Sequence, residues 1–377
     1  MKRLIKRKFA QAIKSVRFLR ASIIKVLLRM KGLIKRKFAQ AITYPARSLY
    51  RFLEADEFMF IALDHVVKLR PDVVHCHDLA TLNAGLKMSD ACSSKLVYDS
   101  HELEMHRNAK YTVATKLRRR KQEQRGIKRA DAVITVSESI ADHLMDDYKI
   151  RRPHVVLNAP DFSEHEKSSR MLRQDLCLSN DIPLAVYVGN VTVNRGLEFV
   201  VRALVHYPDL HLATVGPRRS ATTEELRDLA IELHVEDRLH FVDAVPPEAV
   251  VGYISTADCS VLPIQNVCLS YYYCMPNKLL ESVFAGIPVA VANLLEMRRF
   301  VETFRCGVVM DEKSPESIAE AIKIVIKERE NYTVTQNVIQ KLHETYSWTA
   351  QVEKLRSIYK NLEADIDSRK KLFMSDG

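Results

Sequence analysis

The chain has 377 residues, of which 47% are hydrophobic and 28% charged, a composition that suits a globular protein with room for two domains. Its seven scattered cysteines include no C-x-x-C pair, which argues against a disulfide framework or a cysteine zinc site and favours a reducing compartment. No apolar run approaches the ~20 residues that span a bilayer, and charges interrupt every apolar run near the N-terminus. We therefore expect neither a transmembrane helix nor a cleavable signal peptide.

The formal net charge of +10 is concentrated at the N-terminus. Residues 1–51 contain 16 Lys and Arg and no acidic residue, whereas the rest of the chain has 41 basic and 47 acidic residues. Within this stretch the decapeptide at Leu4–Ile13 recurs identically at Leu33–Ile42. The offset equals about eight helical turns, so both copies would face the same way on a helix, with a break expected at Gly32.

Each copy of the decapeptide gathers apolar side chains on one helix face and basic side chains on the other. A basic amphipathic helix of this kind binds an anionic membrane surface. We therefore predict that residues 1–48 form basic amphipathic helices that hold the protein peripherally on the cytoplasmic, inner face of the membrane. A nucleic-acid arm, a partner-docking helix and a solvated face are the alternatives. No aromatic platform accompanies the cations, and we predict no nucleic-acid partner.

Alternating strands and helices then predict a small Rossmann-like domain over residues 49–160. The expected order is helix 49–69, strand 71–78, helix 80–87, strand 95–99, basic helix 116–129, strand 132–136, a helix capped by Ser139, and strand 154–158. Polar residues 159–167 are expected to link this domain to the next.

Two neighbouring strands of this first domain end in polar residues, namely His75, His77 and Asp78 on one and His101 and Glu102 on the other. This is the sheet edge at which parallel α/β folds bind ligands, although a single histidine is more often structural. Strand alternation directs His75 and His77 to the same face. A metal site there would need ligands from elsewhere, and we predict no metal.

The same alternation continues more regularly over residues 161–345 and predicts a second Rossmann-like domain. Expected strands are 185–188, 211–215, 239–242, 259–262, 289–292 and 308–310, and expected helices are 197–205, 223–233, 247–254, 277–285 and 315–327. Residues 346–377 complete the chain with a helix at 349–362 and a charged tail. The predicted fold class is therefore α/β, with two Rossmann-like domains after basic N-terminal helices.

Two turns of the second domain carry charged residues that suit a phosphorylated ligand. Gly189 and Asn190 follow the first strand, and Arg195 precedes the next helix, where an arginine binds a diphosphate well. Lys278 and Glu281 lie in the first turns of helix 277–285, so that one cation and one carboxylate share its start. An exposed arginine beside a turn glycine and an ordinary charged helix start are the alternatives, because no P-loop and no G-x-G-x-x-G is present.

Taken in order, several segments resemble family 4 retaining glycosyltransferases, whose GT-B fold has two facing Rossmann-like domains. The matching segments within residues 68–362 are 72–78, 96–102, 132–137, 158–160, 188–196, 257–263 and 276–288. The resemblance implies that Arg195 binds the donor diphosphate, Glu281 the nucleotide ribose and His101 the donor sugar. It also implies a nucleotide-sugar donor such as a UDP- or GDP-sugar, no cofactor, and a C-terminal helix that crosses back to the first domain.

The chain departs from the family pattern at three places. Tyr273 stands where the family has the first Glu of its E-x7-E motif, and Asn190 where many members have a second basic residue. The family's first strand and glycine-rich loop have no counterpart, since no Gly lies between Gly32 and Gly85. We expect the acceptor side to be completed by the N-terminal segment and the basic helix 116–129, or by a partner protein.

These observations predict a membrane-associated transferase that moves a hexose-type sugar from a nucleotide sugar to a lipid-linked or surface-glycan acceptor. Catalysis is assigned to His101 and Glu281, with Gly189, Asn190, Arg195, Lys278 and Tyr273 binding the donor. His77, Asp78 and Glu102 are assigned to the acceptor side. The alternative is a catalytically inert scaffold or partner subunit of the same fold.

Overall fold

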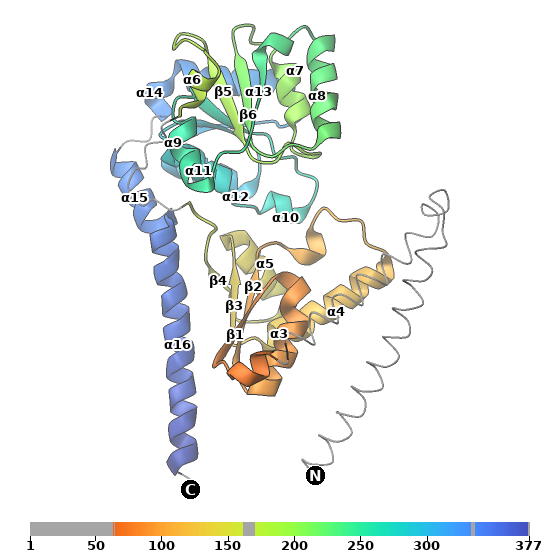
Figure 1. Cartoon of the computed structure of the whole chain (residues 1–377), viewed down its shortest axis with the longest axis vertical. Coiled ribbons are helices and arrows are strands. Elements are labelled where there is room, and N and C mark those ends of the chain that lie inside the picture. The colour runs from red at the N-terminus through yellow and green to blue at the C-terminus, as the bar shows by residue number, and fades with distance from the viewer. Residues whose placement is uncertain (1–62, 64, 161–169, 333–335, 376–377) are drawn as a thin grey trace. The chain divides into compact units, whose positions relative to one another are not determined.

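The computed structural model describes residues 63, 65–160, 170–332 and 336–375 (Figure 1). The chain divides into two compact units, residues 1–68 and 69–377, and the described residues of the first unit are helical. The decapeptide repeat and the predicted amphipathic helices lie outside the described residues, as does most of the predicted linker. No helix in the described ranges is both long and apolar enough to cross a bilayer.

The first sheet has four parallel strands in the order β1-β2-β3-β4. Its elements are β1 (Val73–His77), α3 (Asp78–Cys92), β2 (Lys95–Ser100), the 3-10 turn η1 (Glu104–His106), α4 (Val113–Arg129), β3 (Ala132–Thr135), α5 (Glu138–Tyr148) and β4 (His154–Val155). Register places His77 of β1 opposite Asp99 of β2. The ends of these two strands therefore bring their polar side chains together.

Strand alternation gives the first sheet two buried faces. On one face, Cys76, Leu96 and Tyr98 pack with residues of α3, α4 and α5. On the other face, Val97 and Ile134 pack against Ile358 and Leu362 of the C-terminal helix α16 (Trp348–Ser375). The second face is therefore covered by a helix more than 200 residues further along the chain, and it is the face that carries His75, His77 and Asp99.

The second sheet has six parallel strands in the order β10-β9-β8-β5-β6-β7. Its first part comprises α6 (Leu172–Asp175), β5 (Leu184–Val188), α7 (Leu197–Ala203), β6 (His211–Val215), α8 (Ser220–Glu232), η2 (Glu236–Arg238), β7 (Leu239–Val242), η3 (Pro247–Ala249), α9 (Val250–Ile254) and β8 (Cys259–Leu262). Its second part comprises α10 (Leu269–Tyr272), α11 (Asn277–Phe284), β9 (Val289–Ala292), α12 (Leu295–Phe304), β10 (Gly307–Met310), α13 (Pro315–Lys327), α14 (Arg329–Tyr332) and α15 (Gln336–Tyr346).

Both faces of the second sheet are buried under helices. Tyr187 and Val261 pack on one face with residues of α7, α8 and α13, and Val291 packs on the other with residues of α11 and α12. The order reverses between β5 and β8, since β5 pairs with β6 on one side and with β8 on the other. Such a reversal opens a crevice at the carboxyl ends of the two strands.

The predicted class, two Rossmann-like α/β units, is confirmed, while several element boundaries were wrong. Ser137 rather than Ser139 caps α5, because the Ser137 hydroxyl accepts a hydrogen bond from the Ile140 N–H. Ser139 lies inside α5, where its N–H donates to Glu296. Helix α12 was not predicted, and α16 continues to Ser375 instead of ending near residue 362.

Candidate active site

The crevice between β5 and β8 is formed by turns that need glycine. Gly189 follows β5 with a φ of +118°, and Gly196 caps α7 with a φ of +74°. A Cβ at Gly196 would lie 2.1 Å from the backbone oxygen of Pro263, which follows β8. The start of α7 therefore packs directly against the end of β8, and Arg195 stands beside this contact.

Lys278 extends from the first turn of α11 into the same crevice. Its Nζ lies 3.9 Å from the centre of the Tyr187 ring, and a Cβ at Gly189 would lie 3.4 Å from Nζ. Burial, followed by the nearby Arg195 cation, lowers the pKa of Lys278 to about 7. The ammonium group is therefore held over an aromatic ring and under the backbone turn after β5, where it is half-buried.

Arg195 and Glu281 complete this group of charged side chains. The Arg195 guanidinium lies 5.4 Å from the centre of the Tyr271 ring. Burial raises the pKa of Glu281, and the Lys278 cation opposes that rise. Within the described ranges neither Arg195 nor Lys278 forms an ion pair with a carboxylate. Two cations thus lie close together with only the Glu281 carboxylate nearby and, in the described ranges, no carboxylate in direct ion-pair contact, an arrangement that favours an anionic ligand.

Asn190 and Tyr273 are placed differently from the other predicted donor residues. Asn190 is exposed, and its backbone oxygen accepts a hydrogen bond from the Tyr187 hydroxyl at 3.0 Å. Tyr273 packs against the core of the first sheet, its ring centre 6.1 Å from that of His143. Its backbone oxygen accepts a hydrogen bond from the Ser137 hydroxyl at 2.7 Å. The contacts of Tyr273 therefore join the two α/β domains, which both lie within residues 69–377.

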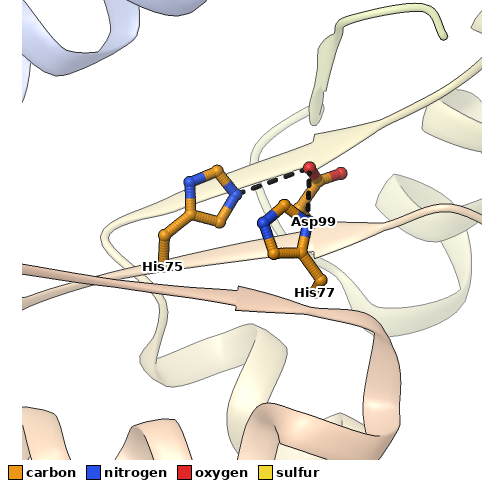
Figure 2. Close-up of side chains that lie close together, drawn as sticks. All are labelled: His75, His77 and Asp99. Carbon is orange, nitrogen blue, oxygen red and sulfur yellow. Dashed lines mark ion pairs between the residues drawn. The ribbon is translucent and has the colours of Figure 1, made fainter.

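The polar residues at the β1 and β2 ends converge on Asp99, which the sequence analysis did not single out. Asp99 Oδ2 lies 3.3 Å from His101 Nε2 and 3.4 Å from His77 Nδ1 (Figure 2). Burial raises the pKa of Asp99, but the neighbouring histidines outweigh it and hold the pKa well below its ordinary value. The hydrogen bond with Asp99 raises the pKa of His101. The signal in the sequence that could have found Asp99 is its position at the end of the strand predicted at 95–99, directly before the polar residues 100–102.

Asp78 and Glu102 make contacts of their own near this cluster. Asp78 has a φ of +58°, and its Oδ1 accepts a hydrogen bond from the His101 N–H at 3.1 Å. Glu102 pairs with Arg107 at 3.1 Å. Asp78 thus positions the backbone of His101, whereas the carboxylate of Glu102 is partly neutralised by Arg107.

Two Rossmann-like domains, with cations at the topological switch point of the second, are consistent with the GT-B fold. Two family models match this chain: "Glycosyl transferases group 1" over residues 169–342 and "Glycosyltransferase Family 4" over residues 28–164. The chain belongs to the group 1, family 4 glycosyltransferases, enzymes that transfer a sugar from a nucleotide-sugar donor.

Known proteins share this architecture at low sequence identity. An uncharacterized glycosyltransferase of Methanocaldococcus jannaschii is 24% identical over 302 residues, which cover 77% of this chain and 75% of that protein. Sucrose-phosphate synthase from Thermosynechococcus elongatus has a TM-score of 0.71 at 20% identity, with 83% of this chain and 79% of that chain covered. HepE of Anabaena, solved in complex with UDP, has a TM-score of 0.64 at 18% identity, with 80% of this chain and 82% of that chain covered.

Proposed function

We propose that the crevice between β5 and β8 binds a UDP- or GDP-sugar and that the chain transfers its sugar with retention of configuration. The observation that carries this proposal is the pair of cations, Arg195 and Lys278, that share the crevice without a carboxylate partner. A nucleoside diphosphate supplies the missing negative charge. The UDP bound to the related Anabaena fold supports a uridine donor.

In this proposal Arg195 and Lys278 stabilise the charge that develops on the leaving diphosphate, which lies against the turn formed by Gly189 and Asn190. Glu281, one turn after Lys278 on α11, accepts hydroxyl groups of the ribose. His101 faces the donor sugar, and the acceptor hydroxyl attacks on the side that the leaving group departs from. No nucleophile of the protein and no divalent metal takes part in this step.

We further propose a lipid-linked or surface-glycan acceptor at the inner face of the membrane. Support for the location comes from the basic residues of the segment 1–48 and their repeated amphipathic pattern. His77, Asp78 and Glu102 are assigned to the acceptor side because they lie at the carboxyl ends of β1 and β2. A partner protein that completes the first domain is part of the same proposal.

The donor proposal is tested with the purified chain and a panel of UDP-, GDP- and ADP-sugars. We expect one nucleotide to bind and its sugar to be hydrolysed or transferred, and we expect Glu281→Ala to weaken both. Glu302→Ala is the matched control, since Glu302 is an exposed carboxylate on α12. Absence of binding to every donor would contradict the proposal, and so would equal activity of the two variants.

A second candidate function, an inert scaffold subunit at the membrane, is favoured by Tyr273. This residue replaces a carboxylate of the family pattern and contacts the first sheet instead. The same Glu281→Ala variant separates the two functions in cells. If the Glu281→Ala variant keeps the cellular function, that function does not require nucleotide binding, and the scaffold function is supported.

The membrane part of the proposal rests on residues 1–48 and is tested separately. We expect the full chain to co-sediment with vesicles that contain anionic lipid, and a chain lacking residues 1–48 to stay in the supernatant. Vesicles of neutral lipid are the control. Equal sedimentation of the two chains with anionic vesicles would remove the membrane assignment and leave the donor proposal intact.

A further inference from the structure

The two cations of the β5–β8 crevice each lie against an aromatic ring. Lys278 Nζ is 3.9 Å from the centre of the Tyr187 ring, and the guanidinium carbon of Arg195 is 5.4 Å from the centre of the Tyr271 ring. A cation within about 6 Å of a ring centre is attracted by the negative charge of the ring face. Each crevice cation therefore has an aromatic side chain as its partner.

The other cation–aromatic contacts of the chain differ in what the cation also binds. The described ranges contain three further contacts of this kind, and in each of them the arginine also forms an ion pair with a carboxylate. They are Arg119 on Tyr111 with Glu104, Arg120 on Tyr148 with Asp147, and Arg227 on Phe241 with Glu224. Among the described residues, neither Arg195 nor Lys278 forms an ion pair. Only the crevice cations are therefore held by a ring without a carboxylate.

A ring and a carboxylate leave a cation in different states. A carboxylate neutralises the cation and occupies the N–H groups that a phosphate would need. An uncharged ring attracts the cation through one face and leaves its charge and its remaining N–H groups available to an anion. A side chain that is already held in place also loses less conformational freedom when the ligand binds. Aromatic partners are therefore suited to hold the cations of an anion site.

Tyr187 is fixed firmly enough to provide such a surface. It is fully buried on β5, in the same core cluster as Leu197 of α7. Its hydroxyl donates a hydrogen bond of 3.0 Å to the backbone oxygen of Asn190. The residue under the Lys278 ammonium group therefore also holds the turn after β5, where a Cβ at Gly189 would lie 3.4 Å from Nζ.

We propose that Tyr187 and Tyr271 are positioning residues, which hold Lys278 and Arg195 at the diphosphate position without neutralising their charge. This inference rests on the proposed donor site and adds two residues to it. Neither tyrosine contacts the reacting atoms, and each acts through the cation on its ring. The sequence analysis gave no role to either residue, because Tyr187 has the pattern of an ordinary core residue in the strand predicted at 185–188.

The pKa of Lys278 gives a readout that a purely structural role of Tyr187 would not change. Burial and then Arg195 lower this pKa to about 7, whereas Cys274 and Glu281 act in the opposite direction. The Tyr187 ring favours the charged form of the lysine. Fluorine atoms on an aromatic ring withdraw negative charge from its face with little change in shape. A fluorinated ring at position 187 should therefore lower the pKa of Lys278 further.

This pKa is measured in the full chain without ligand, from the pH dependence of the acetylation rate of Lys278 followed by mass spectrometry. We expect Tyr187→Phe to keep the pKa within about 0.3 units, and pentafluorophenylalanine at position 187 to lower it by about one unit. Pentafluorophenylalanine at position 253 is the matched control. Tyr253 is equally buried, but its hydroxyl binds Asp175 and it does not contact Lys278. This control should leave the pKa unchanged.

Binding of UDP, GDP and ADP to the same variants, measured by calorimetry at pH 8, provides a second readout. Pentafluorophenylalanine at position 187 should weaken nucleotide binding about tenfold relative to Tyr187→Phe, because the charged fraction of Lys278 falls by that factor. Tyr271→Leu should weaken it about threefold relative to Tyr271→Phe, since the Arg195 contact is partly exposed. Circular dichroism verifies the fold of each variant.

The inference is overturned if the pKa of Lys278 is the same with both rings at position 187. It is also overturned if a nucleotide binds the unmodified chain but binds equally well to the two variants at position 187. A chain that binds none of the nucleotides would contradict the donor proposal instead. The comparison of pKa values without ligand would then still support or overturn the role given to Tyr187.

Discussion

The carboxyl ends of the two sheets differ in the charged side chains that they carry. At β5 and β8, Arg195 and Lys278 rest on aromatic rings and, in the described ranges, form no ion pair with a carboxylate. At β1 and β2, three histidines surround the single carboxylate of Asp99. The first arrangement has cations without a direct carboxylate partner, whereas in the second the carboxylate already has three histidines beside it.

This difference teaches that a shared architecture does not dictate a shared ligand. Both edges are carboxyl ends of parallel strands, yet one uses the start of α11 and a glycine turn to hold ammonium and guanidinium groups. The other uses strand register to stack imidazoles. The chemistry of each edge follows from its side chains and not from the fold.

Removing a cation from the β5–β8 edge is expected to have the largest effect. We predict that Lys278→Ala and Arg195→Ala each lower kcat about 10²–10³-fold, because each removes charge stabilisation from the leaving diphosphate. Steady-state kinetics with the donor found in the nucleotide-sugar panel measures this loss. Lys341→Ala, at an exposed position of α15, is the control and should leave kcat unchanged. Loss of less than about threefold in both crevice variants would mean that the cations do not act on the leaving group.

The sequence was sufficient to predict this edge because its parts are local. Gly189 to Arg195 span a single strand–helix turn, Lys278 and Glu281 lie one turn apart on one helix, and the helix predicted at 277–285 is observed as Asn277–Phe284. The prediction that His75 and His77 share a face is confirmed by their stacked rings. The catalytic and binding roles given to these residues stay predictions.

The other edge depends on contacts that sequence patterns do not contain. Tyr359 meets His75 from 284 residues away, and the helix that carries it was predicted to end near residue 362. The capping serine was assigned to Ser139 instead of Ser137 because both lie near the helix start, and only tertiary contact commits Ser139 to Glu296. In both examples, the Tyr359–His75 contact and the position of Ser139, the structure depends on contacts between residues far apart in the sequence.

A matched pair of glycines tests how rigidly the basic edge is built. Gly196 and Gly286 have nearly equal φ angles of +74° and +72°, but a Cβ meets the Pro263 backbone oxygen at Gly196 and open space at Gly286. We predict that Gly286→Ala lowers the free energy of unfolding by about 1–2 kcal/mol, the cost of a left-handed conformation. Gly196→Ala should cost at least about 1 kcal/mol more because the backbone must shift. Urea unfolding measures the free energy of unfolding of both variants. Equal losses would show that the backbone before α7 accommodates a Cβ at position 196 without further cost.

Donor binding at the basic edge is expected to take up a proton. The pKa of Lys278 is lowered to about 7, so the lysine of the free protein loses its charge as the pH rises through that value. An anionic diphosphate favours the protonated form, and affinity should therefore fall by up to about tenfold per pH unit above pH 7. Calorimetry at pH 8 in buffers of different ionisation enthalpy measures the uptake. Lys278→Arg, which stays charged, should abolish it, and uptake that persists in this variant would assign the proton to another group.

The smallest effect is expected at Tyr273, one of the residues that join the two Rossmann-like domains. Its ring packs on the first core and its backbone oxygen accepts the bond from Ser137, so the described contacts do not use the hydroxyl. Tyr273→Phe keeps both contacts and should change the rate of sugar transfer by less than about threefold. Tyr273→Ala, which removes the ring, should reduce both the rate and the stability. If instead Tyr273→Phe abolishes transfer while its fold and donor binding are preserved, the hydroxyl acts on the sugar. The tyrosine would then have taken over the role of the carboxylate that it replaces. Its contact between the two Rossmann-like domains would be catalytic and not only structural.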